Sequence, residues 1–144
     1  MSAAFLIVRV AGDRVAIPAE RVHSVIEVGV VTPAPRAPDF IAGLTSLRSR
    51  TLTVIDTAKA LGLDEESAQA ALAVVLDSDG CGYALLVEEV ENVEIAEAKP
   101  CRPDVRLADG WKRVTRGLVE TPAGSLLIAD PDLVVAGPQR RDAA

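Results

Sequence analysis

The sequence FLIVRVAGDRVAIP at residues 5–18 decides the fold, because it is typical of a β-hairpin and returns in the second half of the chain. An apolar run interrupted by Arg9 and a second apolar segment lie on either side of a turn at Gly12. Two short apolar segments joined by a glycine-containing turn indicate paired antiparallel strands. Residues 73–86 repeat the pattern at an offset of 68, so that Gly12 falls on Gly80. The hairpin is therefore predicted twice.

The internal repeat extends well beyond this hairpin. Residues 19–25 match 87–93 at the same offset, and residues 43–56 match 117–130 after an insertion of six residues. Each half is therefore predicted to hold a hairpin, a short helical turn, a long loop and a second hairpin that ends in an aspartate. Four or five short strands in about 65 residues favour a small barrel, because closure removes exposed strand edges. We predict an all-β chain of two pseudo-symmetric barrels forming one body; the alternative is a coincidence between short aliphatic segments.

The repeat also predicts the domain organisation. A single barrel of this length would be marginal in size, and two packed together bury more surface. The predicted boundaries are 1–144 for one domain, 5–66 and 70–135 for its approximate halves, and 136–144 for a flexible tail. We further expect strand exchange at the edges, with residues 1–14 joining strands from residues 70–144.

Composition narrows the classes of function. Hydrophobic residues are 49% of the 144 residues and aromatic residues only 3%, so the core must be aliphatic. The net charge of -6 argues against nucleic-acid binding, which usually needs a basic excess to neutralise phosphates. One His and two Cys are too few for a nitrogen and sulfur metal site. The longest purely apolar run, residues 70–76, is far shorter than a membrane span. We expect a cytoplasmic domain with no cofactor, no metal and no catalysis.

Three segments in a fixed order carry a family resemblance. They are residues 5–25, which include FLIV, AIP and ERVHSV; residues 38–56, PDFIAGLTSLRSRTLTVID; and residues 82–90, GYALLVEEV. Together they resemble the CheW family of chemotaxis coupling proteins. The middle segment is similar to the family's Gly-hydrophobic-x-Asn-Leu-Arg-Gly signature, with Ser46 in place of the Asn and Ser49 in place of the last Gly. Glycine reaches positive φ without steric cost, so Ser49 indicates a turn of different shape.

The resemblance implies a fold, an activity and partners. The fold is a pair of five-stranded, SH3-like barrels (CheW-like), and the family has no known catalytic activity. The implied partners are the regulatory domain of a CheA-type histidine kinase and the cytoplasmic tip of a methyl-accepting chemoreceptor, with no nucleic acid and no direct membrane insertion. The chain would work in the cytoplasm, at membrane-associated receptor arrays. The alternative is a divergent tandem SH3-like scaffold that binds other proteins or peptides outside the main chemotaxis pathway.

The candidate binding residues are Val22, Val25, Arg48 and Leu72. Arg48 occupies the signature arginine, whose five donors in a rigid fork suit either a partner carboxylate or a structural role on the barrel. Val22, Val25 and Ile26 have helical spacing and predict a short amphipathic helix. Its apolar stripe either joins the core or lines a groove between the barrels, where an amphipathic receptor hairpin would dock. Leu72 is expected to line the same groove.

Other reactive side chains are predicted to have structural roles. Asp56 and Asp130 occupy equivalent positions in the two halves, so helix capping is favoured over acid/base chemistry. His23 is expected at the surface or in a cap. The remaining residues are two cysteines, Cys81 and Cys101, expected as free thiols, and Trp111, expected to pack at the barrel junction although basic residues surround it.

Overall fold

The computed structural model describes residues 2–63, 71–100, 109–122 and 124–137. The strands are β1 (Ser2–Val10), β2 (Asp13–Pro18), β3 (Val22–Glu27), β4 (Ile41–Leu47), β5 (Arg50–Ile55), β6 (Leu72–Ser78), β7 (Cys81–Val87), β8 (Glu89–Lys99), β9 (Thr115–Thr121) and β10 (Gly124–Ala129). The helical elements are η1 (Ala19–Arg21), α1 (Thr57–Ala60), α2 (Asp109–Val114) and α3 (Pro131–Ala136). Cys101, most of the predicted tail and the predicted boundary between the halves lie outside the described residues.

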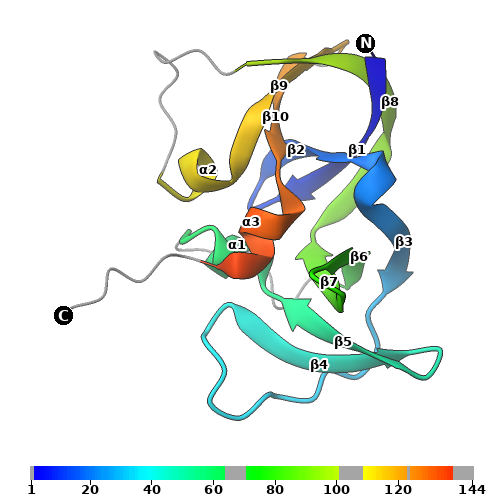
Figure 1. Cartoon of the computed structure of the whole chain (residues 1–144), viewed down its shortest axis with the longest axis vertical. Helices are drawn as coiled ribbons and strands as arrows, with labels where there is room; N and C mark the ends of the chain where they lie inside the picture. Colours follow the sequence, from blue (N-terminus) through cyan, green and yellow to red (C-terminus); the bar gives the residue numbers. More distant parts are fainter. Residues whose placement is uncertain (1, 64–70, 101–108, 123, 138–144) are drawn as a thin grey trace.

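The strands form two five-stranded sheets (Figure 1). The first is a closed barrel in the order β1-β2-β10-β9-β8, here called barrel A. The second, here called sheet B, has the order β3-β6-β7-β5-β4. The hairpin that begins each half therefore lies with three strands of the other half: β1 and β2 join β8, β9 and β10, while β6 and β7 join β3, β4 and β5.

The two sheets have the same topology, as the sequence repeat predicts. Exchanging β1 for β6, β2 for β7, β8 for β3, β9 for β4 and β10 for β5 converts the order of barrel A into that of sheet B. The direction of pairing follows the same rule, because β10 pairs with β2 in parallel and β5 pairs with β7 in parallel. The predicted fold class, all-β with two pseudo-symmetric five-stranded units and short helical turns, is confirmed.

The two units differ in how they close. Barrel A closes where Ala98 and Lys99 of β8 pair with β9. In sheet B, β3 ends at Glu27, and the gap to β4 is bridged by two backbone hydrogen bonds of 2.8 Å between Thr32 and Leu44. A hydrogen bond of 2.9 Å from Oγ1 of Thr45 to the carbonyl oxygen of Val30 adds to this bridge. Gly29 interrupts the segment between β3 and this bridge, and glycine weakens a strand. Barrel A is thus closed by paired strands, whereas sheet B is closed through the segment that follows β3.

The predicted helix at Val22, Val25 and Ile26 is wrong, because these residues belong to β3. Only the three residues of η1 before them are helical. A register shift between Val22 and Ser24 marks a β-bulge against β6. Such a bulge inserts one residue and so puts Val22 and Val25 on the same face of the strand, three positions apart. The spacing that indicates a helix is produced here by a bulged strand rich in β-branched residues, which favour strands.

Three apolar clusters form the interior. Barrel A encloses Phe5, Ile7, Ala16, Val119, Leu126 and Ile128, and sheet B encloses Leu52, Val54, Ala73, Val75, Ala84 and Leu86. The largest cluster, here called the central core, lies between the two units and contains Leu6 and Val8 of β1 with Val74 and Leu76 of β6. Alternate residues of each hairpin thus point into their own unit or into the shared core.

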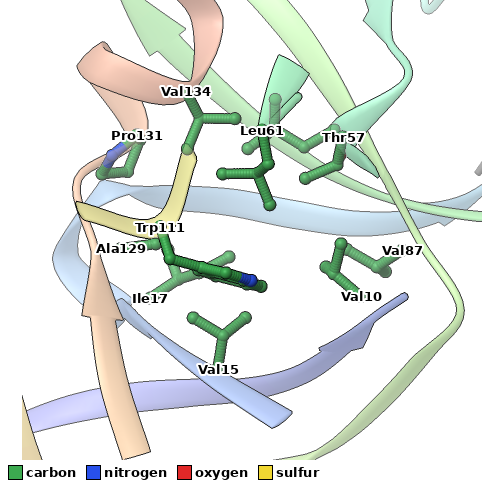
Figure 2. Close-up of a pocket in the computed structure, with 11 residues that line it drawn as sticks. Val10, Val15, Ile17, Thr57, Leu61, Val87, Trp111, Ala129, Pro131 and Val134 are labelled. Carbon is green, nitrogen blue, oxygen red and sulfur yellow. The ribbon is translucent and has the colours of Figure 1, made fainter. Parts of the chain in front are cut away.

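The space between the units is filled. Trp111 is 7% exposed and packs in the central core, as predicted. The cavity beside it, shown in Figure 2, measures about 20 Å³, close to the volume of one water probe. At this position, packed side chains fill the boundary between the two units, so a partner cannot enter the predicted groove here. No helix among the described residues has the length and hydropathy to cross a bilayer.

Two equivalent glycines are required where the sheets close. Gly43 of β4 has φ of 151° and Gly117 of β9 has φ of 152°. A Cβ at Gly117 would lie 2.6 Å from the carbonyl oxygen of Lys99, and one at Gly43 would overlap the carbonyl oxygen of Thr32. Glycine is needed at both positions, because any other residue combines a rare φ with a clash against the backbone.

We expect Gly43→Ala and Gly117→Ala each to lower the free energy of unfolding by at least about 2 kcal/mol, through backbone strain and this overlap. Urea denaturation of the purified chain measures the effect. Gly29→Ala is the matched control, because a Cβ there meets nothing within 4 Å, and its stability should equal that of the wild type. Equal stability of the Gly43 and Gly29 variants would contradict the assignment.

Candidate functional site

The structure brings three of the four predicted binding residues onto one face of sheet B. Val22 lies opposite Leu76, Val25 opposite Val74, and Leu72 lies on the same strand face as both partners. Directly opposed side chains in an antiparallel pair lie about 5 Å apart on one face. We call Val22, Val25 and Leu72 the β3–β6 surface.

The β3–β6 surface continues the central core to the outside. Val22 and Leu72 are partly buried and pack against that core, whereas Val25 is 40% exposed. Ile26 faces the opposite way and packs inside sheet B. The surface is consequently apolar, attached to a rigid sheet and open at Val25.

Arg48 lies apart from this surface, in the turn between β4 and β5. Arg48 and Ser49 are the two turn residues, with φ of 50° and 68°, and both are exposed. Two consecutive positive φ values are typical of a type I′ hairpin turn, which normally contains glycine. The turn thus keeps a left-handed residue at Ser49, where the family signature has Gly, and it presents Arg48 to solvent.

A charged cluster that the sequence reasoning missed lies next to this turn. Asp77 of β6 accepts a hydrogen bond from Arg50 of β5 and lies 2.8 Å from Nε2 of His23 on β3. The Arg50 hydrogen bond, and after it that of His23, lowers the pKa of Asp77. We call Arg50, Asp77 and His23 the sheet B cluster. The repeat is the signal that could have revealed it, because His23 and Asp77 occupy the positions of Glu91 and Arg9.

A second charged cluster joins the first half of the chain to its last helix. We call it the clasp; it contains Arg21, Ser78 and Asp132. Arg21 of η1 binds both carboxylate oxygens of Asp132 on α3, at 2.7 and 3.0 Å, and Ser78 of β6 donates to the same carboxylate at 2.7 Å. These hydrogen bonds, from Arg21 first and Ser78 second, lower the pKa of Asp132 to about 2. Arg21 also donates to the carbonyl oxygen of Asp77, which links the clasp to the sheet B cluster.

Asp56 and Asp130 cap helices, as predicted. The Asp56 side chain accepts a hydrogen bond from the backbone N–H of Lys59 in α1 at 3.2 Å. The Asp130 side chain accepts one from the backbone N–H of Asp132 in α3 at 2.9 Å. Their recurrence in both halves therefore reflects repeated architecture.

One of the basic residues around Trp111, Arg113, serves the packing of the helices. Arg113 donates to the carbonyl oxygen of Leu133 in α3 at 2.5 Å and to that of Ala60 in α1 at 2.7 Å. Its partial burial lowers the pKa of the guanidinium. Arg113 thus joins the ends of two helices that are equivalent in the repeat, and it is not part of an exposed basic patch.

Reactive side chains elsewhere offer little chemistry. Cys81 is exposed at the start of β7 and carries a free thiol. Within the part of the chain that the structure describes, no three His, Cys, Asp or Glu side chains are grouped so that they could hold a metal ion.

Comparison with known proteins gives a consistent result. A family model described as "CheW-like domain" matches residues 4–138. The chemotaxis protein CheW of Thermotoga maritima is 26% identical over 117 residues, which cover 81% of this chain and 76% of that protein. Protein FrzA of Myxococcus xanthus is 39% identical over 61 residues, 42% of this chain and 38% of that protein. The crystal structure of the scaffolding protein TtCheW from Thermoanaerobacter tengcongensis has a TM-score of 0.81 at 21% identity, covering 93% of this chain and 92% of that one.

The double hydrogen bond of Arg113 gives one prediction. Arg113→Lys should lower the free energy of unfolding by about 1–3 kcal/mol, because an ammonium group cannot reach both carbonyl oxygens with the geometry of a guanidinium. Thermal or urea denaturation measures it. Lys112→Arg, at the exposed neighbouring position, is the control and should leave stability unchanged. A stable Arg113→Lys variant would show that the two carbonyls are satisfied in another way.

The Arg21–Asp132 clasp gives a pH-dependent prediction. Because the folded pKa of Asp132 lies below its unfolded value, the clasp stabilises the fold above about pH 4 and this contribution disappears as the pH falls towards 2. Asp132→Asn should therefore cost about 0.5–1 kcal/mol at pH 7, a small effect since the carboxylate is 52% exposed, and less at pH 3. Urea denaturation at both pH values tests this, with the exposed Asp79→Asn as control. A cost that stays constant with pH would contradict the role of the carboxylate.

Proposed function

The chain belongs to the CheW-like domain family, and on this premise we propose that it is a non-enzymatic adaptor that couples membrane chemoreceptors to a CheA-type histidine kinase. CheW-like proteins are scaffolds of chemotaxis signalling and are not enzymes. The proposed partners are the cytoplasmic tip of a chemoreceptor and the regulatory domain of the kinase. The proposed place of action is the cytoplasm, at membrane-associated receptor arrays.

The β3–β6 surface is the observation that carries the proposal. Val25 is a large apolar side chain that is 40% exposed on a sheet face otherwise continuous with the central core. A receptor tip is an amphipathic helical hairpin, and such helices dock with their apolar stripe against apolar surfaces. Because β3 is paired with β6 along its length, the surface is held in place before binding, which lowers the entropic cost of association.

Arg48 supplies the second contact in this proposal. It lies in the β4–β5 turn, whereas β3 and β6 lie at the other end of the strand order of sheet B. Two exposed features on separate strands of one rigid unit suit a protein that holds two partners at once. A guanidinium in a turn is matched by a carboxylate on the partner, with which it forms charge-assisted hydrogen bonds.

Binding of the full chain to purified partners tests the adaptor role. We expect Val25→Asp to weaken binding of a soluble chemoreceptor tip at least tenfold, because it places a charge in an apolar contact. Arg48→Ala should weaken binding of the tip or of a CheA regulatory domain, with the melting temperature unchanged. The affinities can be measured by calorimetry, with Val30→Asp as control, since Val30 is 85% exposed and lies outside β3.

Three results would contradict the proposal. If the wild-type chain binds neither the receptor tip nor the kinase regulatory domain of any candidate system, this result favours a scaffold outside chemotaxis. Unchanged affinities for Val25→Asp and Arg48→Ala would place the contacts elsewhere. An equal loss in Val30→Asp would show that charge alone, and not the β3–β6 surface, weakens binding.

A further inference from the structure

The tip of the β4–β5 hairpin extends beyond the strands that hold it. Pairing between β5 and β7 covers only residues 53–55. On the other side of the hairpin, β4 meets the segment after β3 at Leu44 and Thr45, before the turn is reached. Figure 1 shows the turn between β4 and β5 projecting from the body of the molecule. The turn also holds two non-glycine residues, Arg48 and Ser49, at positive φ, a conformation that costs free energy. Besides the packing of Leu47 in the interior of sheet B, a side-chain contact with another strand would restrict this tip further.

Arg50 provides such a contact. It follows the turn directly, and its guanidinium donates to the carboxylate of Asp77 on β6, two strands away in sheet B. The guanidinium passes over Gly82 of β7, where a Cβ would lie 2.9 Å from Nη2 of Arg50. His23 of β3 holds the other oxygen of the same carboxylate, and the nearby Arg21 donates to the backbone carbonyl of Asp77. The hairpin tip is thereby connected to β6, across β7, by a side chain.

Barrel A contains a charged cluster at the equivalent position of the repeat, so it shows what the Arg50–Asp77 ion pair contributes in sheet B. Glu91, the counterpart of His23, binds Arg14 through two hydrogen bonds of 2.6 and 2.7 Å and lies 3.8 Å from Arg9, the counterpart of Asp77. Arg14 of β2 is the counterpart of Gly82, so in barrel A the second cation comes from the first hairpin. The counterpart of Arg50 is Gly124, which has no side chain. Only in sheet B does the cluster reach the second hairpin.

We propose that Arg50 is a positioning residue: its ion pair with Asp77 fixes the β4–β5 turn and so sets the orientation in which Arg48 meets a partner. The effect of the ion pair on the turn does not depend on any partner. The orientation of Arg48 towards a partner rests on the proposed adaptor function, because it assumes that Arg48 contacts the receptor or the kinase. The turn contains no glycine, so the ion pair would also offset part of the cost of its two positive φ values.

Amide hydrogen exchange of the full chain tests the Arg50–Asp77 ion pair without any partner. In Arg50→Gln, the amides of residues 46–51 should exchange about two- to fivefold faster, the range expected for breaking a half-exposed ion pair. One molar salt should produce the same change in the wild type, because screening weakens the pair. Arg14→Gln is the matched control: it breaks the equivalent pair in barrel A and should leave residues 46–51 unchanged. The double variant Arg50→Asp with Asp77→Arg should restore slow exchange.

Binding tests the orientation of Arg48 towards a partner. Arg50→Gln should weaken the same partner that Arg48→Ala weakens, by a smaller factor, and the charge-swapped double variant should recover most of the affinity. Unchanged exchange at residues 46–51 in Arg50→Gln, or equal acceleration in Arg14→Gln, would overturn the proposal. The positioning role would be overturned if Arg50→Gln exchanges faster at residues 46–51 but keeps full affinity for a partner that Arg48→Ala binds more weakly. If the wild type binds no partner, the adaptor function fails, while the exchange result still decides whether the ion pair holds the turn.

Discussion

The packing of two sheet faces against each other is the constraint on which the rest of the structure depends. Alternate residues of β1 and β6 point into the central core, and their neighbours fill barrel A and sheet B. Neither unit can tilt or separate without exposing Leu6, Val8, Val74 and Leu76 together, and burying such side chains stabilises a fold by about 1.5–3 kcal/mol each. The exchanged hairpins strengthen this constraint, because each sheet contains strands from both halves of the chain. The β3–β6 surface and the paired strands at the base of the β4–β5 hairpin are thus parts of one rigid frame.

The sequence predicts this architecture through its repeat, since Gly12 and Gly80, or Asp56 and Asp130, report equivalent positions without any knowledge of contacts. It does not predict β3 correctly. Apolar spacing in one strand carries no information on a bulge, which exists only because Val22 and Ser24 pair with particular residues of β6. Likewise, the closure of sheet B at a single bridge depends on where two distant segments meet, which local patterns do not encode.

Some residues of the candidate site could be predicted from the sequence and others could not. Val22, Val25 and Leu72 could be grouped in advance because apolar side chains near a core have few other places to lie. The roles of Arg50 and Arg113 could not be predicted, because a charged side chain acquires a role only when its partner arrives from elsewhere in the chain, and the repeat offers only Gly124 as the counterpart of Arg50. Arg113 illustrates this point: its sequence neighbours suggest a basic patch, and its partners are carbonyl oxygens of two helices.

The exchange of hairpins also governs the order in which the chain can fold as it is synthesised. Phe5 of β1 pairs with Glu94 of β8, and Ala16 of β2 pairs with Ile128 of β10. Pairings so distant in sequence must wait for most of the chain to emerge, and contacts of this kind slow folding. Sheet B needs residues only up to Val87, so it can assemble first and offer its apolar outer face to the late-forming barrel A. During that interval, the first hairpin has exposed edges, which makes it the segment most open to capture by a chaperone or by another nascent chain.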